Sequence, residues 1–389
     1  MIRDPRGRGN GRGKLIVEAA QALQYLEAMG HEQNAVLLYH PVARGNPFLA
    51  TIYGGMWERG IASLPLNRLR DLSAIEPLLA AGRRVILHLH WIKGWPDSAK
   101  TEAEMRAASE TYLNRIDAFL EAGGRLAWTV HNVLPHDTGF PELAAALQQA
   151  VVDRAEIVHI MNAGTVAEVG EWFKIPPEKV VQIPHPNYRS AYQDIVTRDQ
   201  ARYDLGLSPD EIVYAAVGSI QPYKGLELLL DAFDAVAKRS PRPRRIVLAG
   251  APAEVEEVDV LLDRCLLHPQ VVLSAKRVPD VEMQLYLRAA DVVVLPYRRS
   301  LNSGVLLLAL SFGLPVVVAT AGIDNELTSP DVARTFEPGN LDSLADALLS
   351  ADELLAPGTR EAALRLADTF DPMVIRRRFA DEMVERFLG

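Results

Sequence analysis

Two hydrophobic periods alternate along the whole chain. Short continuous apolar runs, typical of buried strands, are separated by longer stretches whose apolar residues recur at helical spacing. This pattern predicts an α/β fold, because parallel strands return to the same edge of a sheet through crossover helices that cover both its faces. The runs predict strands at Ala35–Tyr39, Arg84–His88, Leu126–Val130, Ile157–Ile160, Val180–Ile183, Ile212–Val217, Arg245–Ala249, Val271–Leu273, Val292–Leu295 and Val316–Ala319.

The stretches between these runs predict the helices. They lie at Phe48–Arg59, Ser73–Ala81, Glu102–Ala122, Pro141–Arg154, Asn162–Phe173, Leu226–Arg239, Ala253–His268, Asp280–Ala289, Gly304–Phe312 and Asp342–Leu349. Apolar residues at helical spacing predict two further helices, Lys14–Met29 near the start and Pro372–Leu388 at the end. Glutamate and glutamine interrupt the apolar residues of Lys14–Met29, so this segment indicates an amphipathic helix and not a signal peptide.

The longest apolar run, Val305–Ala321, approaches the length of a membrane span, which needs about 20 residues. Gly313, Leu314 and Pro315 divide the run, and β-branched residues follow. It therefore predicts a buried helix, a tight turn and a buried parallel strand, and no transmembrane helix is expected.

A polar segment, His185–Arg202, separates two halves that share the same strand–helix rhythm. At 389 residues the chain is too long for one ordinary core and fits two domains. We predict a basic tail and amphipathic helix over residues 1–30, Rossmann-like domains over residues 31–190 and 191–371, and a C-terminal helix over residues 372–389. The expected architecture is two doubly wound domains facing across a cleft, with ligands at the carboxyl ends of the strands.

Composition and charge narrow the classes of function. The chain has 49% hydrophobic and 23% charged residues, which is typical of globular enzymes. Its net charge of −9 provides no global positive field, so no nucleic-acid partner is expected. Cys265 is the single cysteine, which excludes an intrachain disulfide and a cysteine metal cage and fits a reducing cytoplasm.

The loop after the predicted strand Ile212–Val217 contains a candidate anion site. It reads G-S-I-Q-P-Y-K-G and precedes a predicted helix. Gly218 lets the backbone approach a ligand, and Lys224 places a positive charge beside a helix N-terminus, where a diphosphate is favoured. The alternative is a turn glycine followed by a solvated lysine, and this loop alone does not decide between the two.

A second candidate lies further along the chain. Ser303 and Gly304 begin a helix that is otherwise apolar, so its first amides and the Ser303 hydroxyl are able to bind phosphate oxygens. Taken alone, Ser303 is better explained as the N-cap of that helix.

In order, spacing and strand–helix context, these segments resemble the donor-binding domain of family-four and related GT-B glycosyltransferases (glycosyl transferases group 1). The similar stretches are VGSIQPYKGLELLLDAF, VVLSAKRVPDVEMQLYLRAADVVVLPY, NSGVLLLALSFGLPVVVATAGIDNE and FEPGNLDSLADAL. The resemblance covers most of the C-terminal half and implies the GT-B fold, with a nucleotide sugar bound by the second domain. It implies donor binding by Gly218, Ser219, Lys224, Ser303 and Gly304, with the diphosphate held by Lys224 and the start of the Ser303–Gly304 helix.

The chain departs from the usual family pattern at three positions. Ser219 stands where an arginine is usual, and Ser300 and Leu308 stand where the family usually has two glutamates, the later of which grips the ribose. The chain therefore resembles a subgroup with a Ser-Gly helix start and no glutamate pair, which leaves ribose recognition and the stereochemical class open. Glu326 is the remaining candidate for a donor-side carboxylate, and an exposed loop glutamate is the alternative.

The N-terminal half is expected to present the acceptor and any catalytic base. His131 follows a predicted strand in the stretch W-T-V-H-N-V-L-P-H-D, at the end where parallel sheets bind ligands. A histidine there is able to take the proton of an acceptor hydroxyl, since its ordinary pKa is about 6.5. Asp137 is a second candidate, as the base itself or as a group that orients a histidine. The alternative is a purely structural His131.

Further residues are candidates for the acceptor site. His90 and Trp91 follow another predicted strand, where an aromatic face suits a sugar ring, and Asn46 lies in the loop after the first strand. His88 and His90 share one face of a strand, but there is no evident third metal ligand and no D-x-D motif, so neither a metal nor another cofactor is expected. His185 lies where the resemblance places the interdomain hinge, and a locally bonded linker residue is the favoured interpretation.

The sequence thus predicts an enzyme that moves a hexosyl unit from a nucleoside diphosphate sugar to an acceptor hydroxyl. If the reaction inverts, His131 or Asp137 is the base; if it retains, the departing phosphate is the better proton acceptor. Another GT-B reaction, such as that of a nucleotide-sugar epimerase, and an inactive nucleotide-sugar-binding scaffold are the alternatives. The resemblance suggests a saccharide or lipid-linked saccharide acceptor in polysaccharide or glycan assembly, and a cytoplasmic location with peripheral contact at the inner face of the membrane.

Overall fold

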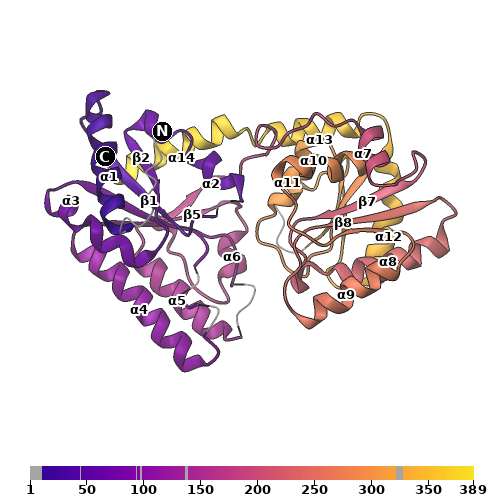
Figure 1. Ribbon diagram of the computed structural model, residues 1–389, viewed down its shortest axis with the longest axis horizontal. Coiled ribbons are helices and arrows are strands. Elements are labelled where there is room, and N and C mark those ends of the chain that lie inside the picture. The colour runs from indigo at the N-terminus through magenta and orange to yellow at the C-terminus, as the bar shows by residue number, and fades with distance from the viewer. Residues whose placement is uncertain (1–10, 44, 93, 97–98, 136–138, 321–326) are drawn as a thin grey trace, which may run out of the picture. The chain divides into compact units, whose positions relative to one another are not determined.

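The computed structural model describes residues 11–389 except 44, 93, 97–98, 136–138 and 321–326. The chain forms two compact units. Unit 1 runs up to Pro184 and also includes Met373–Gly389, whereas unit 2 is His185–Pro372. Each unit contains a six-stranded sheet whose described strand pairs are all parallel (Figure 1). The C-terminal segment therefore returns to the unit in which the chain begins.

The sheet of unit 1 has the strand order β2-β1-β3-β4-β5-β6. Its strands are β1 (Ala35–His40), β2 (Ile61–Pro65), β3 (Arg84–Leu89), β4 (Arg125–Thr129), β5 (Ile157–Ile160) and β6 (Val180–Gln182). The order reverses at β1, which pairs with β2 on one side and with β3 on the other. At such a switch point, the connections leave to opposite faces of the sheet and open a crevice at the carboxyl ends of the strands.

The sheet of unit 2 has the order β12-β11-β10-β7-β8-β9. Its strands are β7 (Ile212–Val217), β8 (Arg244–Ala249), β9 (Val271–Ser274), β10 (Val292–Leu295), β11 (Val316–Ala319) and β12 (Ala333–Phe336). Here the order reverses between β7 and β10, which pair directly. Each unit is thus a doubly wound sheet, as the sequence predicts, and each has one switch point where a ligand is expected.

The helices cover the sheets on both faces. In unit 1 they are α1 (Gly11–Ala28), α2 (Pro47–Ile52), α3 (Glu76–Ala80), α4 (Glu102–Glu121), α5 (Pro141–Arg154), α6 (Thr165–Val169) and α14 (Pro372–Phe387). In unit 2 they are α7 (Arg198–Asp204), α8 (Leu226–Arg239), α9 (Glu256–Leu267), α10 (Asp280–Ala289), α11 (Gly304–Ser311), α12 (Leu341–Ser350) and α13 (Thr359–Asp368). In unit 1, α4 and α5 lie side by side against β4 (Figure 1).

Three predicted helices differ from the structure. The stretch predicted as one helix over Phe48–Arg59 is α2 followed by the separate 3-10 turn η1 (Trp57–Arg59), since two adjacent glycines after Tyr53 disfavour a continuous helix. The stretch Ser73–Ala81 begins inside the 3-10 helix η2 (Leu69–Ile75), and only Glu76–Ala80 of it forms the α-helix α3. The stretch Asn162–Phe173 shortens to α6, which lies between two glycines. The predicted type is right in each case, but the length is overestimated.

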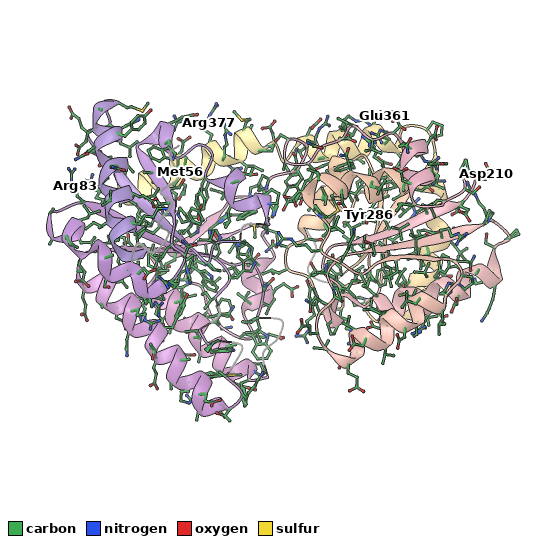
Figure 2. The ribbon with its side chains drawn as sticks, viewed as in Figure 1. Met56, Arg83, Asp210, Tyr286, Glu361 and Arg377 are labelled. Carbon is green, nitrogen blue, oxygen red and sulfur yellow. The ribbon has the colours of Figure 1, made fainter. Side chains whose placement is uncertain are left out.

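The apolar run Val305–Ala321 divides as predicted into α11, a turn and the buried strand β11. Over the described ranges, the chain has no helix that is long and apolar enough to cross a membrane. Figure 2 shows the side chains of both units, with Met56 and Tyr286 buried, and Asp210 and Glu361 exposed.

Candidate active site

The two loops predicted to bind a donor meet at the switch point of unit 2. Gly218 directly follows β7, and Ser303 lies between β10 and α11. Because β7 and β10 are neighbouring parallel strands, the loops after them leave from the same edge of the sheet. Two segments far apart in the sequence are therefore placed at the position where doubly wound sheets bind ligands.

Lys224 is buried at this switch point. Lys224 is the last residue of the 3-10 turn η4 (Pro222–Lys224), and it is 6% exposed. The Nζ atom lies 5.5 Å from the ring centroid of Tyr297. Burial lowers the pKa of Lys224 to about 8, with no carboxylate among the described residues acting against this shift. A buried ammonium without an anionic partner is costly, so the site favours an anionic ligand.

Gly218 allows this arrangement. It has a φ of 97°, and a Cβ atom there would lie 3.0 Å from Lys224 Nζ. A side chain at this position would need a disfavoured backbone conformation and would crowd the ammonium. The neighbouring Ser219 is exposed.

Ser303 is the N-cap of α11. Its Oγ accepts a hydrogen bond from the Leu306 backbone N–H at 3.2 Å, and its hydroxyl also bonds to the Tyr297 side chain. Gly304 is the first residue of the helix, and a Cβ atom on it would lie 3.0 Å from Tyr188 Oη. The capping interpretation is thus observed, whereas contact of Ser303 and Gly304 with a donor stays a prediction.

The half-buried His185 and the buried Tyr188 form a pair beside the start of α11. The Nδ1–H of His185 donates to the Pro186 carbonyl at 2.7 Å, so its Nε2 accepts from Tyr188 Oη at 3.3 Å. Burial lowers the pKa of His185 to about 4 and keeps the ring neutral. The sequence interpretation treats His185 as a linker residue and does not include Tyr188. The available signal is an aromatic residue within an otherwise polar segment.

The remaining donor-side positions are less informative. Ser300 is half-buried, and Leu308 lies in α11 at 4% exposure, among apolar side chains. Two predicted residues, Glu326 on the donor side and Asp137 on the acceptor side, lie outside the described residues.

Unit 1 contains a cluster of buried histidines at the carboxyl ends of β3, β4 and β5. Alternation along β3 places His88 and His90 on the same face, with ring centroids 4.4 Å apart. His131 follows β4, and His159 lies within β5. Their exposed fractions are 0% for His88 and His159, 1% for His90 and 9% for His131. Buried imidazoles need hydrogen-bond partners, and each of these rings has one.

One half of the cluster connects β3 to His131. Tyr53 is the C-cap residue of α2, and its Oη lies 2.7 Å from His88 Nδ1 and 2.5 Å from His90 Nε2. The other ring nitrogen of His90, Nδ1, lies 3.0 Å from His131 Nε2. His90 and His131 therefore share a direct hydrogen bond, and the Tyr53 hydroxyl connects this pair to His88.

The other half runs across the sheet. His88 Nε2 lies 2.8 Å from Thr129 Oγ1, which lies 3.0 Å from His159 Nδ1. His159 Nε2 lies 2.8 Å from the Ile183 carbonyl oxygen. We call the six side chains from His131 to His159 the histidine chain. They are His131, His90, Tyr53, His88, Thr129 and His159.

Aromatic rings enclose the histidine chain. Trp91 stacks on His131 with ring centroids 4.1 Å apart, and Phe48 meets the same ring edge-on at 5.3 Å. Phe379 of α14 stacks on His88 at 5.6 Å. Asn46 caps α2 through a 3.0 Å hydrogen bond from the Phe48 backbone N–H to its Oδ1, which positions the helix that contributes Phe48 and Tyr53.

His88 and His90, in the middle of the histidine chain, are neutral at ordinary pH. Burial lowers the pKa values of His88 and His90 well below the usual value, and neighbouring imidazoles add to the effect. Burial likewise raises the pKa of Tyr53. Of the members of the histidine chain, the sequence pattern points to His88, His90 and His131. It does not point to Tyr53, Thr129 or His159. The one local signal is a histidine in the otherwise apolar strand I-V-H-I.

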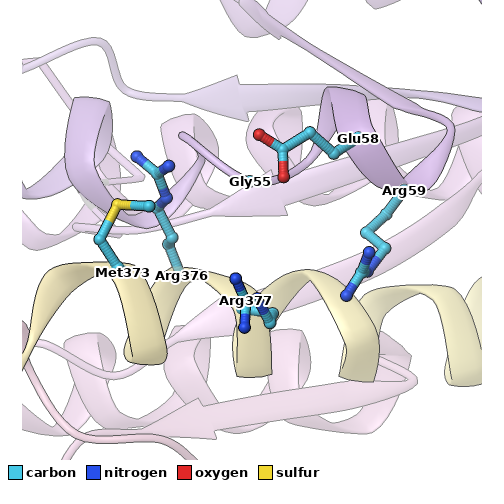
Figure 3. Close-up of a pocket in the computed structure, with 6 residues that line it drawn as sticks. All are labelled: Gly55, Glu58, Arg59, Met373, Arg376 and Arg377. Carbon is cyan, nitrogen blue, oxygen red and sulfur yellow. The ribbon is translucent and has the colours of Figure 1, made fainter.

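A separate pocket lies on unit 1 between η1 and α14 (Figure 3). It is lined by Gly55, Glu58, Arg59, Met373, Arg376 and Arg377. None of the predicted site residues lines it, so it is not part of the candidate active site. Across the part of the chain that the structure describes, no group of three or more His, Cys, Asp or Glu side chains is placed to hold a metal ion.

Comparison with known sequences supports a glycosyltransferase. Residues 211–352 match the family described as Glycosyl transferases group 1. A GDP-mannose:glycolipid 4-beta-D-mannosyltransferase of Xanthomonas campestris pv. campestris is 29% identical over 282 residues, which cover 71% of this chain and 70% of that protein. A D-inositol 3-phosphate glycosyltransferase of Rhodococcus erythropolis is 36% identical over 179 residues, which cover 42% of this chain and 40% of the relative.

Comparison with solved structures supports the fold. Anabaena Alr3699/HepE in complex with UDP and glucose superposes with a TM-score of 0.68 at 16% identity, over 90% of this chain and all of that one. WaaG, a glycosyltransferase involved in lipopolysaccharide biosynthesis, superposes with a TM-score of 0.63 at 16% identity, over 89% of this chain and 99% of that one. Taken with the two doubly wound sheets and the sequence relatives, these likenesses identify the chain as a glycosyltransferase of the GT-B fold.

Proposed function

We propose that the chain transfers a hexosyl unit from a nucleoside diphosphate sugar to an acceptor hydroxyl in polysaccharide or glycan assembly. The observation that carries this proposal is the buried Lys224 ammonium at the switch point of unit 2, which has no carboxylate partner among the described residues. A diphosphate supplies the negative charge that this position lacks, and charge-assisted hydrogen bonds to phosphate are strong.

In this proposal Lys224 and the start of α11 both bind the donor diphosphate. The ammonium neutralises the charge that develops on the departing diphosphate, and the first amides of α11 add a positive helix end. In many transferases a metal ion provides this charge. We propose that here the protein provides it, so that no metal or other cofactor is required.

Unit 1 presents the acceptor in this proposal. The acceptor hydroxyl gives its proton to His131, its oxygen bonds to the anomeric carbon, and the sugar–phosphate bond breaks with its electron pair on the diphosphate. Trp91 is half-buried and stacked on His131, so one aromatic face lies beside the base, where a sugar ring packs well. Asn46, His90 and Asp137 remain proposed contributors to this site.

The names of two similar proteins support the proposed classes of both substrates. The name of the Xanthomonas relative gives GDP-mannose as donor and a glycolipid as acceptor, and HepE was solved with UDP and glucose. These names support a nucleotide sugar and a saccharide acceptor. We extend the proposal to a lipid-linked saccharide, which this protein would reach in the cytoplasm by peripheral contact with the inner face of the membrane.

A thermal-unfolding screen tests the donor half. Wild type, Lys224→Met and Lys238→Met are each mixed with UDP-, GDP- and dTDP-linked sugars, Lys238 being an exposed lysine of the same unit. A sugar nucleotide at a hundred times its Kd adds about 2.7 kcal/mol to stability. We expect one to stabilise wild type and Lys238→Met. We expect Lys224→Met to lose this shift, although its free form melts at a higher temperature because a buried charge is gone.

Each contrary result is informative. If no nucleotide sugar stabilises the wild type, the donor proposal is wrong. If the Lys224→Met protein melts lower and keeps its ligand shift, the lysine is structural. If a sugar nucleotide binds and is neither transferred to an acceptor nor converted without one, the chain is an inactive scaffold; conversion without an acceptor would instead indicate another GT-B reaction, such as that of an epimerase.

A further inference from the structure

The His159 end of the histidine chain bonds to a group that can accept a hydrogen bond but cannot donate one. The Ile183 carbonyl has no proton, so the 2.8 Å hydrogen bond from His159 requires a proton on His159 Nε2. His159 is fully buried, which disfavours a charged ring, and a neutral imidazole carries one ring proton, so Nδ1 of His159 accepts. The Thr129 hydroxyl, 3.0 Å away, is then the donor to it.

The same rule fixes each following link. Because the Thr129 hydroxyl donates its single proton to His159, Thr129 Oγ1 accepts the hydrogen bond from His88 Nε2. His88 Nδ1 then accepts from the Tyr53 hydroxyl, and Tyr53 Oη accepts from His90 Nε2. His90 Nδ1 is left as the acceptor for His131 Nε2. With neutral rings, only one direction of hydrogen bonding satisfies every link.

We propose that the histidine chain is a positioning device that fixes the tautomer of His131, with the proton on Nε2 and the lone pair on Nδ1. This inference rests on the proposed function, in which His131 takes the acceptor proton. Nδ1 is then the nitrogen that receives it. Tyr53, Thr129 and His159 act through His131 and are positioning residues.

The structure favours positioning over proton export. The far end of the chain is a backbone carbonyl, which cannot take up a proton, so a proton received at His131 has no exit through Ile183. The members of the chain are buried, and Phe379 stacks over His88, so water does not readily replace a missing link. A chain closed in this way holds one arrangement of protons.

Nuclear magnetic resonance of the imidazole nitrogens tests the tautomer directly. Full-length protein with 15N-labelled histidine distinguishes protonated from unprotonated ring nitrogens, and His131→Asn assigns the signal. In wild type we expect His131 with Nε2 protonated and Nδ1 unprotonated. A neutral His131 with the proton on Nδ1 would overturn the proposal, whether or not a sugar substrate is known.

Tyr53→Phe breaks the chain next to His90. Without the hydroxyl, His90 is free to reverse and place its proton on Nδ1, which forces the His131 proton from Nε2 to Nδ1. We expect the His131 nitrogen signals to change accordingly and kcat to fall about 10²-fold, the lower end of what general-base catalysis contributes, with the KM for the donor unchanged. Tyr112→Phe is the matched control, since this buried tyrosine of α4 lies outside the chain, and it should change neither.

A second pair of variants covers a Tyr53→Phe protein that does not fold. Thr129→Val removes the hydroxyl between His88 and His159 at nearly constant shape, whereas Thr129→Ser keeps it. Valine should disturb the His131 tautomer and serine should restore it. Unchanged His131 signals and kcat in both Tyr53→Phe and Thr129→Val would refute the positioning role while leaving the transferase proposal intact. A failure to find any transfer would instead remove the proposed function and leave the tautomer measurement to stand alone.

Discussion

The two candidate half-sites both lie at the carboxyl ends of parallel strands but differ in their electrostatics. In unit 1, at the carboxyl ends of β3 to β5, the buried histidines hydrogen-bond within the histidine chain, and burial keeps His88 and His90 neutral. In unit 2, at the switch between β7 and β10, the buried Lys224 has a lowered pKa and no carboxylate partner among the described residues. The same architecture thus builds one internally satisfied site and one unsatisfied site.

The difference follows from the charge of what each site is proposed to bind. A neutral acceptor hydroxyl needs a base with a defined lone pair, which an ordered neutral network provides. A diphosphate needs fixed positive charge, and a cation already paired with a carboxylate would have to break that pair first. A buried ammonium with no carboxylate partner among the described residues costs stability in the free protein, and a bound diphosphate restores that stability.

The largest expected effect comes from the centre of the unit 1 site. His131→Asn removes the proposed base but leaves unit 2 intact, so kcat should fall by roughly 10²- to 10⁴-fold while nucleotide-sugar affinity is unchanged. Steady-state kinetics and calorimetric titration measure the two quantities. Lys224→Met is the reverse case, with weakened donor affinity. If His131→Asn also loses donor affinity, the two sites are not separable as described.

Acid should destabilise unit 1 more than unit 2. Burial lowers the pKa values of three histidines in unit 1, which are His40, His88 and His90. In unit 2 it lowers the pKa of His185. Below about pH 6.5 the unfolded chain binds protons that the folded rings refuse, so stability falls as pH falls, by up to about 1.4 kcal/mol per pH unit for each such histidine.

All five tryptophans lie in unit 1, which makes this comparison measurable. Urea unfolding followed by tryptophan fluorescence reports on unit 1, and far-ultraviolet circular dichroism reports on both units. Between pH 7.5 and about pH 5.5, above the range where carboxylates titrate, the fluorescence midpoint should fall further than the circular dichroism midpoint. Equal shifts would contradict the asymmetry.

Alkali should weaken the unit 2 site alone. Lys224 loses its proton in the free protein as pH rises through about 8, whereas a bound diphosphate holds the proton on. Nucleoside diphosphate affinity should therefore decline by about tenfold for each pH unit above 8. Lys224→Met should bind more weakly with no such decline. A wild-type affinity that is flat from pH 7 to 9.5 would show that the ammonium does not meet the phosphates.

Local patterns predicted most elements of both units, but neither the helices α7 and α13 nor the histidine chain. Every predicted strand is present, because a buried parallel strand is a continuous apolar run. The edge strands β2 and β12 were missed, since I-A-S-L-P and A-R-T-F carry polar residues that an edge tolerates. The helix predicted over Phe48–Arg59 was too long, because two glycines follow Tyr53, the C-cap residue of α2, and glycines alone are a weak signal of a helix end in the sequence.

The sequence predicted the residues of the unit 2 half-site better than those of the unit 1 half-site. Lys224 and Ser303 sit in motifs whose order and spacing resemble known donor sites, so the sequence located them. The partners of His131 come from α2, β4 and β5, and their ring and hydroxyl atoms meet only after the sheet has formed. No local pattern marks Tyr53 or Thr129 as members of the same hydrogen-bond chain.

Amide hydrogen exchange with a nucleoside diphosphate tests the central claim most directly. The full chain is compared with and without UDP or GDP, whichever stabilises it. We expect added protection in peptides that cover residues 217–226 and 301–310 of unit 2, and no added protection around His131 in unit 1. Protection confined to unit 1, or none anywhere with either nucleotide, would contradict a diphosphate site at the β7–β10 switch point.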